Sequence, residues 1–317
     1  MLLLYILIFF VSLVLLVFSG GKAVESLTRV SHFLKLREFI VAFILMAFAA
    51  SIPEFFVGIS AALNGIPELS LGGVLGANII ILTLGVGLVV LFLGSLEIER
   101  ETVKRGSILM GAIGLLPLLL ILDGELSRID ACVLLLAFIF YITWLFDREE
   151  LFKKVYDDIE STFLNFKNFL KDSAVFGGSV ALLLISSQGI VKTAAFFADF
   201  LRVRMGIIGL FLVGAGVALP EIYFSIRAGR AGEAKMILGN LMGCVVITST
   251  LVLGLVALIA PIRIADFSPY GAARIFLLIS VLFFLLISRT RNQISKKEGI
   301  VLILVYATFV IFEVLIK

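Results

Sequence analysis

Histidine and cysteine are nearly absent from this chain of 317 residues, which contains one histidine and two cysteines. His32 lies near an expected loop, where a surface position is the simplest interpretation. Cys132 and Cys244 each lie inside an apolar run, without the spacing of a disulfide framework or a zinc site. The sequence therefore offers no His or Cys cluster for zinc or copper, and we expect both thiols to be small buried apolar groups.

Charged residues are also scarce. They make up 15% of the chain, against 61% hydrophobic residues, and the mean hydropathy is +1.19. A soluble domain of this length needs a far more polar surface, so the composition predicts a polytopic membrane protein of the all-α class. The net charge of +3 is spread over short loops rather than gathered in one patch, which argues against a nucleic-acid partner.

Apolar runs long enough to cross a membrane are the dominant feature of the chain. About 20 residues span a hydrocarbon core of about 30 Å, and on this basis we expect ten transmembrane helices. They cover residues 1–26, 38–63, 70–94, 104–122, 128–146, 173–199, 205–229, 234–260, 268–288 and 298–316. The first run lacks the basic start and the small-residue cleavage site of a signal peptide.

The distribution of Lys and Arg predicts the orientation. With the N-terminus outside, the loops on the inner side hold 18 of these residues and the outer side holds 6. Positive residues concentrate in cytoplasmic loops, so both termini are predicted to be extracytoplasmic in a multi-pass protein of the plasma membrane.

A polar segment at residues 147–172 separates two five-helix repeats, at residues 1–146 and 173–317. Its apolar residues recur every three or four positions, as in Phe152 and Val155, which is typical of an amphipathic helix at the membrane surface. We expect a cytoplasmic linker and favour a solvated helix over a regulatory element.

A glutamate at membrane depth, Glu54, interrupts the second apolar run. An ionised residue there costs about 2.5–3.5 kcal/mol on insertion scales, so it needs a reason. Pro53 lacks an N–H, which predicts a break between Ala50 and Ile52 and a new helix start that carries Glu54 in its first turn. Carbonyl groups freed at the break would be cation ligands. The alternative is that Pro53 and Glu54 merely start a helix.

The two halves of the chain repeat each other without a gap across this stretch. The shift that places Pro53-Glu54 on Pro220-Glu221 also places Leu71-Gly72 on Leu238-Gly239 and Gly76 on Gly243. Because each half has five helices, the second half enters the membrane from the opposite side, and the result is a pair of inverted repeats. Broken helices 2 and 7 should then bring Glu54 and Glu221 together, and the glycine-rich starts of helices 3 and 8 should pack closely.

Two facing carboxylates indicate a cation site. At about 4 Å their repulsion is roughly 4 kcal/mol at an effective dielectric constant near 20. One divalent cation, two monovalent cations or two protons would each neutralise the pair, and this equivalence is the basis of antiport. Ca²⁺, which takes about 6–8 oxygen ligands, fits two glutamates and nearby carbonyls better than Mg²⁺ does.

These motifs resemble the cation/calcium exchanger superfamily, in particular its sodium/calcium exchanger branch, as a divergent member of the prokaryotic type. That family carries Gly-Thr-Ser-x-Pro-Glu on helices 2 and 7 and Leu-Gly-Asn-x-x-Gly-Ser at the start of helices 3 and 8. Here the four motifs begin at Ala49, Leu71, Gly216 and Leu238. The resemblance implies that Glu54 and Glu221 are the central metal ligands and that Ser51 is a hydroxyl ligand.

The sequence departs from the family pattern at several ion-binding positions. The family's threonine is Ala50 in the first motif and Val217 in the second, where the following serine is Ala218. The serines on helices 3 and 8 are Ala77 and Cys244, and the Asn or Asp one turn later is Ile81 or Thr248. A site for three sodium ions is therefore not expected. Thr248 is retained as a candidate ligand, although polar residues such as Asn78, Ser249 and Thr250 more often join neighbouring helices.

The sequence as a whole predicts a secondary antiporter that exports Ca²⁺ in exchange for Na⁺ or H⁺. Its partners are lipid and the transported cations, no cofactor is expected, and a monomer is the working hypothesis. A divergent transporter of another cation, or one that uses H⁺ only, is the alternative. An intramembrane enzyme is remote, because no HExxH, GxSxG or GxGD-like motif occurs.

Overall fold

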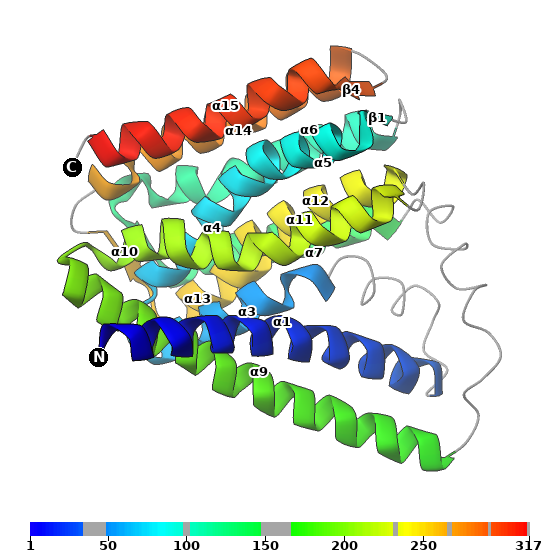
Figure 1. The fold of residues 1–317 in the computed structure, drawn as a ribbon, viewed down its shortest axis with the longest axis vertical. Coiled ribbons are helices and arrows are strands. Elements are labelled where there is room, and N and C mark those ends of the chain that lie inside the picture. Colours follow the sequence, from blue (N-terminus) through cyan, green and yellow to red (C-terminus); the bar gives the residue numbers. More distant parts are fainter. Residues whose placement is uncertain are drawn as a thin grey trace.

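Helices make up nearly all of the computed structural model, which describes residues 1–33, 49–97, 102–146, 166–230, 234–264, 268–290 and 293–315 (Figure 1). The α-helices are α1 (Leu2–Phe33), α3 (Ala49–Leu63), α4 (Glu68–Ile80), α5 (Val86–Leu93), α6 (Thr102–Leu120), α7 (Arg128–Phe146), α9 (Phe166–Leu201), α10 (Met205–Ile208), α11 (Gly214–Arg230), α12 (Ala234–Ile247), α13 (Leu253–Ile259), α14 (Ser268–Thr290) and α15 (Lys296–Leu315).

Short π-helical segments continue several of these helices without a turn. They are η2 (Ile81–Gly85), between α4 and α5; η5 (Gly209–Val213), between α10 and α11; and η6 (Thr248–Val252), between α12 and α13. A 3₁₀ turn, η3 (Ile121–Asp123), follows α6. The shift that superposes Glu54 on Glu221 places η2 directly on η6, so the two halves share this local irregularity as well as their sequence motifs.

Apolar length identifies the chain as a multi-pass membrane protein. Among the described residues, seven helical spans are long and apolar enough to cross a bilayer: Leu2–Leu27, Glu68–Leu93, Gly106–Asp123, Phe169–Leu201, Met205–Tyr223, Ile237–Ile259 and Tyr270–Ser288. The described part of the second predicted helix, Ser51–Leu63, is apolar but shorter. Its expected start at residues 38–48 and the linker at residues 147–165 lie outside the described part of the chain.

Two small antiparallel sheets join the two halves. Strand β1 (Ser95–Glu97) pairs with β4 (Gln293–Ser295), and β2 (Glu125–Leu126) pairs with β3 (Ile262–Arg263). Because β1 precedes α6 and β2 follows it, the two sheets lie at opposite ends of that helix. The same shift between the halves places β1 on β3 and β2 beside β4, so each sheet combines strands from both halves.

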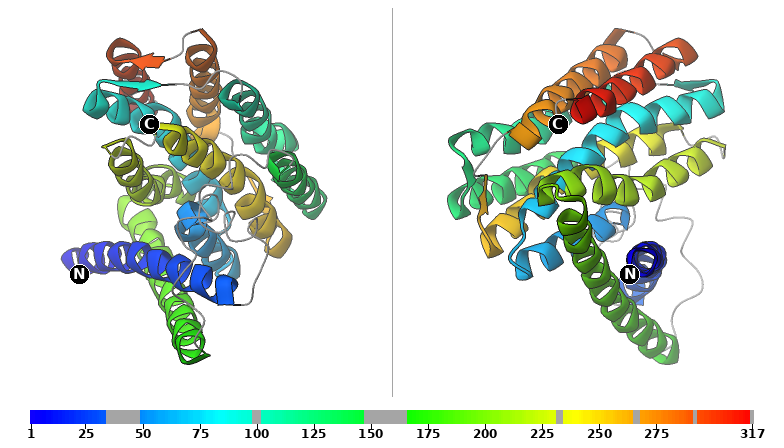
Figure 2. Two further views of the ribbon diagram at one scale, coloured as in Figure 1. Left: turned by 90° about the vertical axis from the view of Figure 1, so that its right-hand side faces the viewer. Right: turned by 60° about the vertical axis from the view of Figure 1, so that its left-hand side comes forward.

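The helices form a central group between two flanks. Helices α1 and α9 pack side by side along one flank, and α14 and α15 lie on the other (Figures 1 and 2). Between them, α3 and α11 contact each other, and both contact α4 and α12. At the end of the flank formed by α1 and α9, Arg29 binds Asp172 through a 2.7 Å contact between Nε and Oδ1.

Two predictions about local structure are wrong. Pro53 and Pro220 lie inside α3 and α11 rather than at a helix start, so neither Ala50–Ile52 nor residues 216–219 form a break. A proline removes only one helical hydrogen bond, and in the second half the irregularity is instead the π segment η5, before α11. Helix α9 also begins at Phe166, within the expected linker, because Phe166–Asp172 continue its helical pattern.

The two thiols differ in burial. Cys244 on α12 is buried, as expected, but Cys132 on α7 is exposed, so the prediction of two buried thiols is wrong for Cys132. An outer position on an apolar helix can face lipid, where a small apolar thiol needs no partner. An apolar run therefore predicts removal from water, but not which side chains pack against protein.

Candidate functional site

The two predicted glutamates lie in the central group of helices. Glu54 is on α3 and Glu221 is on α11, and only 4% and 3% of their surfaces are exposed. The two side chains are close enough to interact electrostatically, and Cys244 on α12 lies near both. The structure thus brings together two acidic groups from opposite halves of the sequence.

Their hydrogen bonding is unequal. Asn240 Nδ2 on α12 donates to Glu221 Oε2 at 2.9 Å, and this contact is buried. Both carboxylate oxygens of Glu54 are buried without any hydrogen-bond partner among the described residues. A buried carboxylate without a partner is costly, so Glu54 requires a proton or a cation to balance it.

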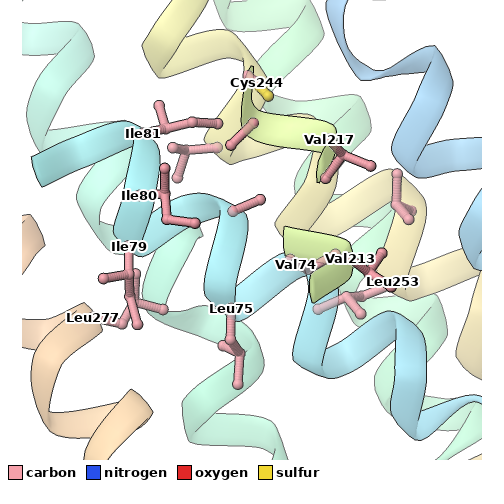
Figure 3. Packing of buried hydrophobic residues seen from close by; sticks show 14 of the residues in the cluster. Val74, Leu75, Ile79, Ile80, Ile81, Val213, Val217, Cys244, Leu253 and Leu277 are labelled. Carbon is pink, nitrogen blue, oxygen red and sulfur yellow. The ribbon is translucent and has the colours of Figure 1, made fainter. Parts of the chain in front are cut away.

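A small cavity lies beside Glu54. Its volume is about 10 Å³, close to the space that one water molecule needs. It is lined by Glu54, Val57, Gly58, Ser70, Gly73, Val74, Val213 and Val217. Figure 3 shows its apolar side, where Val74 on α4 and Val213 in η5 approach each other and Val217 follows one turn later on α11.

The other predicted ligands differ in their relation to the glutamates. Ser51 is fully buried on α3; its hydroxyl has no hydrogen-bond partner among the described residues and lies beside Cys244. Val217 lines the cavity with Glu54, and Ala218 is buried next to it on α11. The backbone of Ala50 belongs to α3, whereas its side chain is outside the described part of the chain.

Thr248 is used to join two helices. Its hydroxyl lies 3.0 Å from Asn78 Oδ1 on α4 and 2.9 Å from the Cys244 carbonyl oxygen of its own helix. Asn78 Nδ2 in turn donates to Ser249 Oγ at 2.9 Å. These contacts confirm the expectation that polar residues here connect neighbouring helices.

Close backbone contact positions the two halves of the site. A methyl group added at Gly72 would overlap the Gly206 carbonyl oxygen, and one added at Gly76 would overlap the Leu210 carbonyl oxygen. The backbone of α4 therefore lies directly against α10 and η5. This contact confirms close packing for the first of the two glycine-rich helix starts. The prediction is wrong for the second, because a methyl group added at Gly239 or Gly243 would meet no described atom within 4 Å.

Asn240, Cys244 and Ser70 were not among the predicted site residues. Asn240 and Cys244 are part of the second Leu-Gly-Asn motif, so the motif gave a signal, but which of its side chains reach Glu221 depends on helix rotation. Ser70 carries no motif and is found only through the cavity. Among the described residues, no three His, Cys, Asp or Glu side chains form a cluster able to hold a metal ion.

Comparison with known proteins matches these features. The profile of the family described as sodium/calcium exchanger protein matches residues 4–146 and 172–315. The sodium/calcium exchanger MaX1 of Methanosarcina acetivorans is 27% identical, with 96% of this chain and 97% of that protein aligned. The inner membrane protein YrbG of Escherichia coli is 25% identical over 92% of this chain and 91% of its own length.

Solved structures share the fold. The sodium-calcium exchanger NCX_Mj superposes with a TM-score of 0.65 at 22% identity and 98% coverage of both chains. The H⁺/Ca²⁺ exchanger CAX gives a TM-score of 0.73 at 16% identity, covering 98% of this chain and 87% of the other. These neighbours are transporters rather than enzymes. From the match over both halves, the chain belongs to the sodium/calcium exchanger protein family.

Proposed function

We propose that the protein is a secondary active cation antiporter that exports Ca²⁺ in exchange for Na⁺ or H⁺. The observation that carries this proposal is the pair of buried glutamates, which interact with each other while Glu54 has no hydrogen-bond partner for either oxygen among the described residues. Both lie on central helices and come from equivalent positions of the two halves.

The chemistry of the pair supports exchange. Two neighbouring carboxylates cannot both remain charged in a dry site unless positive charge joins them. Ca²⁺, two Na⁺ ions or two protons each restore neutrality, so the loaded site can face either side of the membrane, whereas the empty site is costly to move. The ions therefore replace one another rather than leave the site empty.

Alternating access would rest on inverted repeats of five helices, at residues 1–146 and 173–317 with the linker between them. The matching π segments η2 and η6 support this arrangement, as do the two sheets that pair strands from both halves. The Lys and Arg distribution supports extracytoplasmic termini in the plasma membrane. We further propose a monomer, because one chain supplies both glutamates.

The remaining ligands would come from side chains and main chain around the pair. Ser51 contributes its buried hydroxyl, and Thr248 contributes only if it releases Asn78. Ala50, Val217 and Ala218 have no side-chain oxygen, so they can act only through their carbonyl groups. Pro53 and Pro220 have no N–H, so the carbonyl groups of Ala49 and Gly216, four residues earlier, lack the helical hydrogen bond that those positions would donate and are further main-chain candidates.

Transport of another cation, or exchange with H⁺ alone, is the second candidate. It is favoured by the apolar groups at the family's sodium-ligand positions, such as Ala77 and Ile81, and by the thiol of Cys244. Two glutamates with few hydroxyl ligands suit Ca²⁺ and protons at least as well as several Na⁺ ions.

Flux into proteoliposomes tests these proposals. Proteoliposomes that contain the wild-type protein should accumulate ⁴⁵Ca²⁺ when an outward Na⁺ gradient or a pH gradient is imposed. Applying the two gradients separately identifies the counter-ion. Glu54→Gln and Glu221→Gln should each abolish uptake while retaining a monodisperse folded protein. Normal uptake in both variants would remove the site, and flux that responds to neither gradient would exclude antiport with these ions.

A further inference from the structure

The two glutamates occupy equivalent positions but face different neighbours. The shift that superposes Glu54 on Glu221 places Gly73 on Asn240, so the second half has an amide where the first half has no side chain. Asn240 is buried, with 7% of its surface exposed, and its Nδ2 lies 2.9 Å from Glu221 Oε2. The difference in sequence thus becomes a difference in how each carboxylate is held.

Asn240 restricts Glu221 in two ways. Its hydrogen bond takes one of the acceptor sites of Oε2 and fixes the direction in which that oxygen faces. Because Asn240 is on α12 and Glu221 is on α11, the bond also ties the carboxylate to a second helix, which limits the rotamers that it can adopt.

Glu54 has the opposite environment. Neither of its oxygens is bonded among the described residues, and Gly73 leaves the adjacent cavity of about 10 Å³ open. A side chain at position 73 would enter this space, since an added Cβ would lie 3.3 Å from Val213 Cγ1. Glu54 therefore lacks the kind of hydrogen bond that holds Glu221 in place, and it borders a small cavity.

We propose that Asn240 is a positioning residue that holds Glu221 as the fixed cation ligand, and that Gly73 leaves Glu54 as the ligand that moves when ions exchange. This inference rests on the proposed function. It deepens it by assigning unequal roles to two residues that the sequence presents as equivalent. Asn240 acts through Glu221 and does not itself contact the ion.

Substitutions of Asn240 test its role, because loss of a positioning residue should weaken Ca²⁺ binding more than it slows transport. Asn240→Leu and the smaller Asn240→Ala remove the donor, and each should raise the Ca²⁺ concentration for half-maximal uptake by about 10- to 100-fold, the range for losing the partner of a metal ligand. The maximum rate should change much less. Asn240→Gln retains an amide and should recover part of the lost affinity.

Asn64→Leu is the matched control. Asn64 Nδ2 donates to Gln188 Oε1 at 3.0 Å, so this variant also loses an amide hydrogen bond to another helix. Asn64 lies in the turn just after α3, whose end is roughly 14 Å from Glu54 along the helix axis, so the variant's affinity for Ca²⁺ should equal that of the wild type. Equal affinity in wild type, Asn240→Leu and Asn240→Ala, or equal losses in Asn240→Leu and Asn64→Leu, would overturn the proposal.

Measurements on the wild-type protein distinguish failure of the Asn240 proposal from failure of the proposed function. If the wild-type protein moves no Ca²⁺, the proposed function is wrong. The melting temperature of the solubilised wild type is then measured with Na⁺, Ca²⁺, Sr²⁺ and Cd²⁺, and the variants are compared by the shift that the stabilising cation produces. The shift should then shrink in Asn240→Leu and Asn240→Ala but not in Asn64→Leu. Absence of a shift with every cation in the wild type overturns both proposals.

Discussion

The two halves of the site keep the same acid and differ in almost everything around it. The first half has Glu54 with the Ser51 hydroxyl and an open position at Gly73, and the second has Glu221 with Ala218 and the bonded amide of Asn240. The positions are equivalent in sequence, so the difference in hydrogen bonding follows from which side chains occupy them. Internal repetition therefore preserves where charge is placed, while each half determines how firmly it is held.

The central π segments show a similar contrast. In the first half, η2 begins with Ile81 and Leu82, whereas the equivalent residues of η6 are Thr248 and Ser249. The polar segment bonds across to Asn78 on the helix of the other half. Both segments have the same backbone irregularity, but only the second uses it to present polar groups to its neighbour.

Gly76→Ala should have the largest effect, because it disrupts the backbone contact that holds the two halves together. The added methyl group would overlap the Leu210 carbonyl oxygen, which a flexible side chain cannot relieve. Overpacking costs about 1–3 kcal/mol, and more when backbone must move. We expect loss of monodisperse protein in detergent, measured by size-exclusion chromatography.

Gly177→Ala controls for the substitution itself. Gly177 is exposed on the flank helix α9, where a methyl group faces open space among the described residues. Alanine favours a helix by about 1 kcal/mol over glycine, so this variant should be as stable as the wild type or more so. Equal behaviour of both variants would show that the contact between α4 and η5 is not a constraint.

Much of this contact could be predicted from the sequence because it depends on repeated motifs. The repetition of Pro-Glu in both halves predicted equivalent positions for Glu54 and Glu221, and the spacing of Gly72 and Gly76 predicted a close backbone contact. Apolar run length predicted most helical segments, since that signal depends on composition rather than on tertiary contacts.

The rest depended on geometry that the sequence does not encode locally. Pro53 and Pro220 predicted broken helices, but both are accommodated within a helix, and the π segments carry no residue signature. The bond from Asn240 to Glu221 depends on how α12 is rotated against α11. A sequence comparison shows that Asn240 replaces Gly73, but not that it points at the carboxylate.

Ser51→Ala should have the second largest effect, and it sharpens the comparison because Ala218 is the equivalent residue. If the Ser51 hydroxyl binds the ion, its removal should lower the apparent Ca²⁺ affinity by about tenfold, as expected for losing a contact to a charged group worth about 1.5 kcal/mol. The measurement is ⁴⁵Ca²⁺ uptake against Ca²⁺ concentration. A hydroxyl that is merely buried without a partner gives the opposite result, unchanged affinity with equal or greater stability.

Gly73→Ala tests whether Glu54 needs the space beside it. The Cβ would lie 3.3 Å from Val213 Cγ1 and fill part of the cavity, so we expect a several-fold lower maximum rate with unchanged Ca²⁺ affinity. Val213→Ala removes the neighbouring methyl groups, and the double variant Gly73→Ala/Val213→Ala should recover much of the rate. Loss of affinity rather than rate would show that Gly73 serves binding and not movement.

Ser249→Ala should have the smallest effect, because it addresses the polar π segment rather than the carboxylates. The variant removes the acceptor for Asn78 Nδ2, and hydrogen bonds between membrane helices contribute about 0.6 kcal/mol on average. We expect a lower melting temperature with unchanged Ca²⁺ affinity, whereas Leu82→Ala, at the equivalent position of the apolar segment, leaves a cavity and should cost about 2–5 kcal/mol. If Ser249→Ala instead weakens Ca²⁺ uptake, the polar segment contributes to the ion pathway, and the contrast between the halves extends from holding the carboxylates to binding the ion itself.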